Sequence, residues 1–375
     1  MTQRFCGGHF GSRDKMAKAS SSSSHRLPLV FLALIVIGLG NKIFQKLQTI
    51  PMHNYPNFIN LLCTFVYIPL SFAYIIPMIK YGSAITWDQQ HIPKRKFAIM
   101  GALDSVAGIL QIFAATYLGG SLLILLGQAA IPVSMVISKF LLKASYSKFQ
   151  YLGALIVTAG LLVVLGPSMK ASSGGEHTVI WAAVMIASCI PMCLSSVYKE
   201  IALGEAELDV VYLNGWVAVF QFLLSIPLAF PAASISSPPV APSDLLENLY
   251  DGMKCYLGEN TIVGTAHPDD CEKATLYVTI YMLFNVLYNI LIILMLKFGS
   301  ANILWLAMTI MVPLGNVAFT FSFMPEHQPL HTTDIIGLVV IMLGLFVYRF
   351  LGDLLEARAR ARAPSHLKES LMSDF

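Results

Sequence analysis

Residues 120–134 read GSLLILLGQAAIPVS, and residues 299–315 read GSANILWLAMTIMVPLG. Each stretch begins with a Gly-Ser pair and continues as an apolar run that contains a proline. In each case the next apolar segment carries two glycines seven positions apart. These glycines are Gly153 and Gly160 after the first stretch, and Gly337 and Gly344 after the second. The two halves of the chain therefore look like repeats of one unit.

The composition indicates a membrane protein. Hydrophobic residues make up 56% of the 375 residues, charged residues make up 12%, and the mean hydropathy is +0.68. A soluble protein carries about 25% charged residues, so most of this surface must face lipid or other helices. The net charge of +3, with basic residues at the ends of apolar runs, argues against nucleic-acid binding, which needs a basic stripe.

Ten apolar segments are long enough to cross a bilayer. A spanning helix needs ~20 mostly apolar residues, because the hydrocarbon core is ~30 Å thick. We therefore predict an all-α integral membrane protein with ten transmembrane helices, over 28–47, 57–79, 97–118, 121–142, 149–167, 178–201, 212–231, 275–296, 300–323 and 333–351. Five helices per repeat is an odd number, so the two repeats are inverted in the membrane, as in many transporters.

The placement of Lys and Arg predicts the orientation. With a cytosolic N-terminus, nineteen of the 24 Lys and Arg residues fall on the cytosolic side, as do both chain ends. A cleaved signal peptide over 27–40, or an organelle transit segment around residues 20–24, is an alternative reading of the N-terminus. The predicted divisions are a cytosolic tail over 1–27, a five-helix repeat over 28–167, a second repeat over 178–351 with a lumenal loop over 232–274, and a cytosolic tail over 352–375.

Ionisable side chains within the apolar segments mark the candidate site. Such a side chain costs ~2.5–3.5 kcal/mol in the hydrocarbon layer, so it usually faces a cavity. Lys42 is expected to face a cavity, whereas Lys46, one turn further on, is expected to extend to the lumenal headgroups. Asp104 is expected to hold a proton or a cationic substrate group, and a structural ion pair with a cytosolic lysine is the alternative.

Uncharged polar residues extend the predicted pocket, although each alone is more often a link between helices. Lys199 and Glu200 end the sixth segment at the predicted cytosolic surface, where they are candidates for a cytosolic gate. The predicted cavity residues are Lys42, Asp104, Gln111, Gln128, Asn285, Asn289 and Asn316.

Two cysteines share the long loop over 232–274. Cys255 and Cys271 enclose fifteen residues on the side away from the cytosol, where disulfides persist. A bridge would stabilise the loop by ~3 kcal/mol, and two free thiols are the alternative. The sequence contains no nucleophile elbow, phosphate-binding glycine loop or metal-ligand spacing. We therefore expect no catalytic residue, no metal, no cofactor and no enzymatic activity.

Several stretches resemble the chloroquine-resistance-transporter family. They include Gly40-Asn41-Lys42-Ile43-Phe44 in the first helix, Gln128 with Ile131-Pro132, Val197-Tyr198-Lys199-Glu200, and Asp251-Gly252 with Cys255 and Gly258 in the loop. The resemblance covers residues from about 28 to 350. It implies two inverted five-helix repeats, a cytosolic N-terminus and a disulfide-bearing lumenal loop. Some relatives have four cysteines in that loop and this chain has two, so only one bridge carries over.

The resemblance also implies a function. Relatives move amino acids, short peptides or cationic amphipathic solutes out of acidic vacuoles or lysosome-like compartments, driven by protons. By position, Lys42 and Asp104 match the family's cavity-lining residues. The expected partners are therefore a small-molecule substrate, protons and membrane lipid. One alternative is a plastid-envelope carrier of glutathione or γ-glutamylcysteine, and another is a membrane scaffold or receptor that transports nothing.

Overall fold

The computed structural model describes residues 13–82, 84–141, 143, 146–170, 175–206, 208–235, 239–264, 268–298, 301–321, 324 and 332–352. Throughout these ranges the regular structure is helical. The elements are α1 (Arg13–Leu47), α2 (Pro56–Tyr81), α3 (Trp87–Gln90), α4 (Lys94–Tyr117), α5 (Gly120–Gly127), α6 (Ala130–Leu141), α7 (Lys148–Lys170), α8 (Gly175–Ala206), α9 (Val210–Ala233), α10 (Leu245–Tyr256), the 3-10 turn η1 (Cys271–Lys273), α11 (Ala274–Phe298), α12 (Ala301–Ala318), α13 (Thr332–Phe346) and the π-helical turn η2 (Val347–Leu351).

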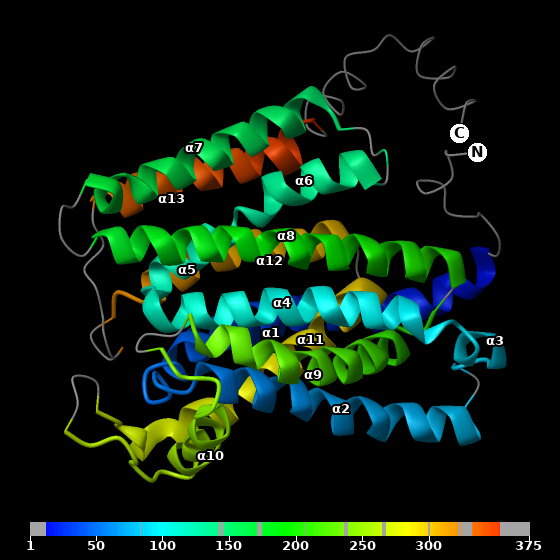
Figure 1. Cartoon of the computed structure of the whole chain (residues 1–375). Coiled ribbons are helices and arrows are strands. Elements are labelled where there is room, and N and C mark those ends of the chain that lie inside the picture. Colours follow the sequence, from blue (N-terminus) through cyan, green and yellow to red (C-terminus); the bar gives the residue numbers. More distant parts are fainter. Residues whose placement is uncertain are drawn as a thin grey trace.

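The long helices run along one common direction and form a bundle (Figure 1). Among the described residues, nine helical spans are long and apolar enough to cross a membrane. They match nine of the ten predicted segments. The remaining segment, 300–323, contains α12, of which the described apolar part Ala307–Ala318 is shorter than a full span. The chain is thus an all-α membrane protein, and the exact count of ten stays a prediction.

The fourth span differs from the single helix predicted over 121–142, because it consists of α5 and α6 joined by a turn at Gln128–Ala129. Pro132 lacks an N–H group, and its ring clashes with the carbonyl four residues earlier, that of Gln128. The turn is held by 3.0 Å bonds from the N–H groups of Gln128 and Ala129 to carbonyls three residues back. The proline that marks the repeat therefore also breaks the helix.

The two glycine pairs with a spacing of seven, one in each half of the chain, let α7 and α13 pack closely. A Cβ added at Gly160 would lie 3.2 Å from the carbonyl oxygen of Gly337, and a Cβ added at Gly337 would lie 3.2 Å from the carbonyl oxygen of Gly160. Likewise, a Cβ at Gly344 would lie 2.9 Å from the carbonyl oxygen of Gly153. All three distances are tighter than ordinary contacts. The two backbones can approach this closely because all four residues are glycine.

Other helix pairs build the rest of the bundle. The helix α4 packs against α8 and α9, α1 packs against α11 and α12, α2 packs against α9, and α6 packs against α8. The connection that contains α10 folds back onto α2, α9 and α11 at one end of the bundle, at the lower left of Figure 1. We call this end the loop end.

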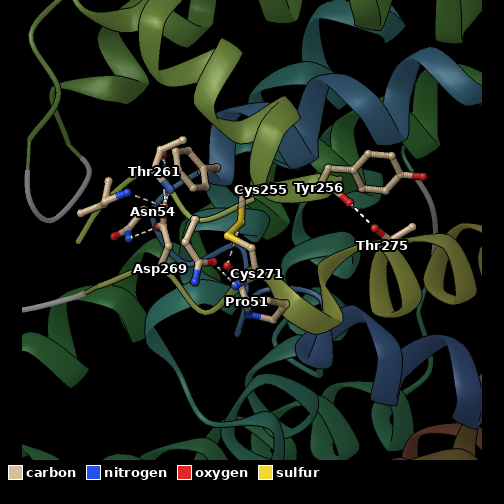
Figure 2. Close-up of a disulfide and its surroundings, with 11 residues drawn as sticks. Pro51, Asn54, Cys255, Tyr256, Thr261, Asp269, Cys271 and Thr275 are labelled. Atoms are coloured by element: carbon tan, nitrogen blue, oxygen red, sulfur yellow. Dashed lines mark hydrogen bonds between the residues drawn. A yellow bond between two sulfur atoms is a disulfide. The ribbon is translucent and has the colours of Figure 1, made fainter. Parts of the chain in front are cut away.

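The disulfide predicted within that connection is present. Cys255, in α10, is bonded to Cys271, in η1, with a Cα–Cα distance of 5.0 Å (Figure 2). Both cysteines are fully buried. The bridge fixes α10 against the start of α11, and this gives the long loop a folded structure of its own.

Beside the disulfide, the Asp269 carboxylate collects hydrogen bonds from two parts of the chain (Figure 2). It accepts from Asn54 Nδ2 at 2.9 Å and from Tyr55 OH at 2.8 Å, both in the connection between α1 and α2. It also accepts from the N–H groups of Thr261 and Ile262, at 3.0 and 2.9 Å. The Asp269 cluster, meaning these five residues, therefore joins the loop to the first half of the chain.

Candidate functional site

A cavity of about 190 Å³ lies among α1, α4, α5, α8 and the turn that follows α12. Its wall combines polar side chains from α1, α4 and the α5–α6 turn with apolar or small residues. The polar residues are Lys42, Gln45, Lys46, Gln111 and Gln128, and the others are Ala115, Gly120, Leu123, Ile124, Gly127, Met185, Cys189, Met192 and Phe319. Three of the predicted cavity residues therefore line one cavity.

Lys42 is the most exposed charge in the wall. The α1 helix carries it into the bundle, where its partly buried side chain faces the cavity. Its ammonium group makes no hydrogen bond or ion pair with the residues that the structure describes. Gln45, which the sequence analysis did not single out, lies on the same wall. Its position between Lys42 and Lys46 on one helical face was the available signal.

Lys46 does not extend to the headgroups as expected. Its side chain is only 6% exposed, and Nζ donates hydrogen bonds to the carbonyls of Ala115 at 3.1 Å and Thr116 at 3.4 Å. These carbonyls lie in the last turn of α4, where backbone acceptors have no partner within the helix. The negative end of the helix dipole also attracts a cation. Lys46 therefore forms its hydrogen bonds inside the bundle, and not with the lumenal headgroups.

Two amides complete the polar wall. Gln111 Nε2 contacts Met192 Sδ at 3.2 Å and so links α4 to α8. Gln128 Nε2 donates to the Ile124 carbonyl at 3.2 Å and supports the turn between α5 and α6. Both side chains keep an amide oxygen that can accept a hydrogen bond from a solute.

Asp104 lies outside the cavity wall. Lys199 Nζ lies 2.6 Å from Asp104 Oδ2, and the two side chains are 27% and 17% exposed. The expected alternative, an ion pair with a nearby lysine, is thus the arrangement observed. Asp104 and Gln111 are two turns apart on α4, about 10.5 Å along the axis. The pair therefore lies beyond the cavity, on the side away from the loop end. The side chain of Glu200, the other predicted gate residue, lies outside the described part of the chain.

Asn285 and Asn289 also lie outside the cavity wall, in a second polar cluster. Tyr67 OH donates to Asn285 Oδ1, and Asn285 Nδ2 donates to Asn41 Oδ1 at 3.0 Å. Asn289 Nδ2 donates to Tyr67 OH at 2.8 Å. These bonds join α1, α2 and α11, which is the interhelical role that such residues often have.

Asn316 is fully buried in α12, and neither atom of its side-chain amide has a partner among the described residues. Its backbone carbonyl accepts from Ser121 Oγ at 3.4 Å, which ties α12 to α5. Phe319, three residues further on, lines the cavity, whereas Asn316 does not. The described residues contain no cluster of His, Cys, Asp and Glu that could hold a metal ion.

Comparison with known proteins identifies the family. The family described as CRT-like, chloroquine-resistance transporter-like, matches residues 27–348. The chloroquine resistance transporter of Toxoplasma gondii is 34% identical over 357 residues, which cover 92% of this chain but 40% of that protein. The chain thus spans less than half the length of this relative.

Two further relatives are covered more fully. Crt homolog 1 of Dictyostelium discoideum is 32% identical, and the match covers 94% of this chain and 79% of that protein. Protein CLT1, chloroplastic, of Arabidopsis thaliana is 27% identical, and the match covers 83% of this chain and 70% of that protein. This chain therefore belongs to the chloroquine-resistance-transporter-like family, whose members are membrane transporters and not enzymes.

Proposed function

We propose that this protein is a proton-coupled secondary transporter that moves small solutes out of an acidic vacuole or lysosome-like compartment into the cytosol. The observation that carries the proposal is the polar cavity within an otherwise apolar helix bundle, with Lys42 in its wall. An ionisable group at such a depth is costly unless it serves a site. Kinship with proteins named chloroquine resistance transporter supports the same conclusion.

The transport proposal includes two inverted repeats, over 28–167 and 178–351, with the loop 232–274 in the lumen and the tails 1–27 and 352–375 in the cytosol. The packing pattern supports it. If α1 corresponds to α8, α4 to α11, and α5–α6 to α12, then the α4–α8 contact is the counterpart of the α11–α1 contact. The α6–α8 contact likewise has its counterpart in α12–α1. Inverted repeats commonly enclose the transport site between them.

We assign the cytosolic gate to the ion pair of Lys199 with Asp104. The pair links α4 to α8 beyond the cavity, so it holds that side of the pathway closed. A proton that binds to Asp104 would remove the charge that attracts Lys199. Gate opening would then depend on the proton supply, which couples the solute to the gradient.

For the solute, amino acids and short peptides fit the cavity better than cationic amphipathic compounds. The cavity volume of about 190 Å³ is below the ~300–1,000 Å³ of pockets that enclose drug-sized ligands. The Lys42 ammonium also repels cations. Lys42→Thr should therefore raise the uptake of an organic cation relative to that of a neutral amino acid. Unchanged relative rates would exclude this role for Lys42.

The plastid envelope is the second candidate location, favoured by the kinship with Arabidopsis proteins named chloroplastic. Identity is higher to the Toxoplasma and Dictyostelium relatives, at 31–34%, than to these proteins, at 26–29%. We therefore rank a vacuolar or endolysosomal membrane first. The position of a fluorescent fusion in the native cell distinguishes the two.

The test of transport uses the purified full chain in proteoliposomes. Uptake of labelled arginine, glutathione and a quinoline-type cation is measured with and without an imposed proton gradient. Gradient-dependent uptake of any of them, absent from protein-free liposomes, supports the proposal. No uptake by protein that shows a cooperative thermal transition would favour a scaffold or receptor. Lys254→Gln, in the loop, serves as a control variant and should transport like the parent.

A further inference from the structure

We propose that the cavity selects solutes with a net negative charge and that Lys42 pairs with a carboxylate of the solute. This inference rests on the transport function proposed above and narrows its substrate class to small organic anions, such as acidic amino acids and short acidic peptides.

The first argument is the balance of charge around the cavity. Two ammonium groups, those of Lys42 and Lys46, face it, and none of the described residues of its wall is Asp or Glu. The nearest carboxylate along α4, that of Asp104, is held by Lys199 at 2.6 Å. Among the described residues the wall is therefore positive, and none of them pairs with Lys42.

The second argument concerns what each ammonium group already contacts. Lys46 Nζ is fixed by the carbonyls of Ala115 and Thr116, so it adds positive potential from a set position. Lys42 has no hydrogen-bonding or ion-pair partner among the described residues. A charge that is partly removed from water and has no partner is costly, so an anion that enters the cavity gains an interaction that the described residues do not supply to Lys42.

The third argument is the geometry of the wall. Lys42 and Lys46 are four residues apart on one face of α1, about 6 Å along the axis. A carboxylate at Lys42 therefore also lies in the field of Lys46. A charge-assisted bond of this kind is about twice as strong as a neutral one.

The remaining polar groups are amides, from Gln45, Gln111 and Gln128. An amide can donate or accept a hydrogen bond, so these groups can orient a hydroxyl, amide or ammonium group of the solute without adding charge. Among the described residues of the wall, a solute ammonium finds only neutral acceptors, whereas a carboxylate finds Lys42. Anions are therefore preferred over zwitterions, and zwitterions over cations.

The test uses solutes that match in shape and differ in charge. Unlabelled glutamate and glutamine compete with whichever of labelled arginine, labelled glutathione and the labelled quinoline-type cation is taken up by proteoliposomes with the full chain. We expect glutamate to compete at least tenfold better than glutamine, and aspartate to show the same advantage over asparagine. Lys42→Gln should abolish the difference, Lys42→Arg should keep it, and Lys254→Gln should leave it unchanged.

A second readout does not depend on transport. Glutamate should raise the thermal unfolding temperature of the detergent-purified protein more than glutamine does, and this difference should vanish in Lys42→Gln. Uptake with equal competition by both solutes, or a glutamate preference that survives Lys42→Gln, would overturn the inference and leave transport standing. If no solute is taken up and neither raises the unfolding temperature, the transport proposal fails as well.

Discussion

Lys199 and Asp104 form an ion pair of 2.6 Å that joins α8 to α4, seven residues along each helix from the contact of Met192 with Gln111. Because the two helices are antiparallel, both contacts lie along one line of contact between α4 and α8. The contact of Met192 with Gln111 borders the cavity, and the ion pair of Lys199 with Asp104 lies about 10.5 Å further along the helices. The same line of contacts between α4 and α8 therefore borders the cavity and continues beyond it to the ion pair.

Breaking this ion pair should uncouple uptake from the proton gradient. An ion pair of this exposure contributes up to about 1 kcal/mol, so Asp104→Asn should shift the gate equilibrium by about fivefold toward opening. Proteoliposome uptake without a gradient should then rise, and the stimulation by a gradient should fall.

The double variant Asp104→Lys with Lys199→Asp restores an ion pair in the reverse direction and serves as the control. It should close the gate again and lower the gradient-free uptake. If Asp104→Asn leaves both rates as in the parent, the ion pair has no part in gating.

The contact between α7 and α13 should be the least tolerant of added side-chain volume. Gly160→Val places methyl groups against the backbone of α13, so we expect a loss of about 1–3 kcal/mol in unfolding free energy from overpacking. Gly166→Ala, also in α7, is the matched control, because a Cβ there meets nothing within 4 Å. Thermal unfolding in detergent should separate the two variants clearly, and equal midpoints would contradict the packing.

Removing the disulfide should destabilise the loop between α9 and α11. Replacing Cys255 and Cys271 by serine is expected to cost ~3 kcal/mol on the chain-entropy estimate. Limited proteolysis should then cut within residues 239–264 sooner than in the parent. A reducing agent should reproduce this pattern in the parent and change nothing in the double variant. If neither the serine replacements nor the reducing agent changes the cleavage pattern, the disulfide does not stabilise this loop.

The Asp269 cluster should respond to acid only well below the pH of an acidic organelle. Burial alone would raise the pKa of Asp269, but the hydrogen bonds from Ile262, Asn54, Tyr55 and Thr261 outweigh it and lower that pKa. A carboxylate with a lowered pKa in the folded state stabilises the fold fully above its unfolded value of ~3.9. That stabilisation is lost as the pH falls through the folded value.

We therefore expect the difference in unfolding temperature between the parent and Asp269→Asn to stay constant from pH 7 to about pH 5. The difference should shrink below about pH 4, as the parent's carboxylate takes up a proton. Thermal unfolding followed across this range measures it. If the difference already shrinks between pH 7 and 5, the Asp269 carboxylate takes up its proton at a higher pH than its hydrogen bonds allow, and the prediction is wrong.

Much of the fold follows from hydrophobic runs and from the residues that interrupt them. Nine spans match the predicted segments, because ~20 apolar residues have few alternatives in a bilayer. Pro132 is visible in the sequence, but its effect on helix continuity depends on whether Gln128 and neighbouring groups satisfy the freed carbonyls. The position of the proline could therefore be read from the sequence, but the division of the span into α5 and α6 by a turn could not.

The candidate site was less predictable, because a polar residue in a membrane helix can face a cavity or a neighbouring helix. Gln111 and Gln128 line the cavity, whereas Asn285 lies against Asn41 and Tyr67 in a separate cluster. Periodicity places these residues on helix faces, but only helix packing decides which face looks inward. Lys46 shows the same limit, since its partners are carbonyls of α4 nearly seventy residues away.

The Asp269 cluster has a consequence for movement. Asn54 and Tyr55 directly precede α2, and Asp269 lies two residues before η1, which leads into α11. One carboxylate therefore links the two halves of the chain at the loop end. The disulfide beside it stiffens the same place. When helices are held together at one end, a change in the angle between them displaces their opposite ends most. The loop end would then act as the pivot, and the widest displacement would fall at the opposite end, where Lys199 meets Asp104.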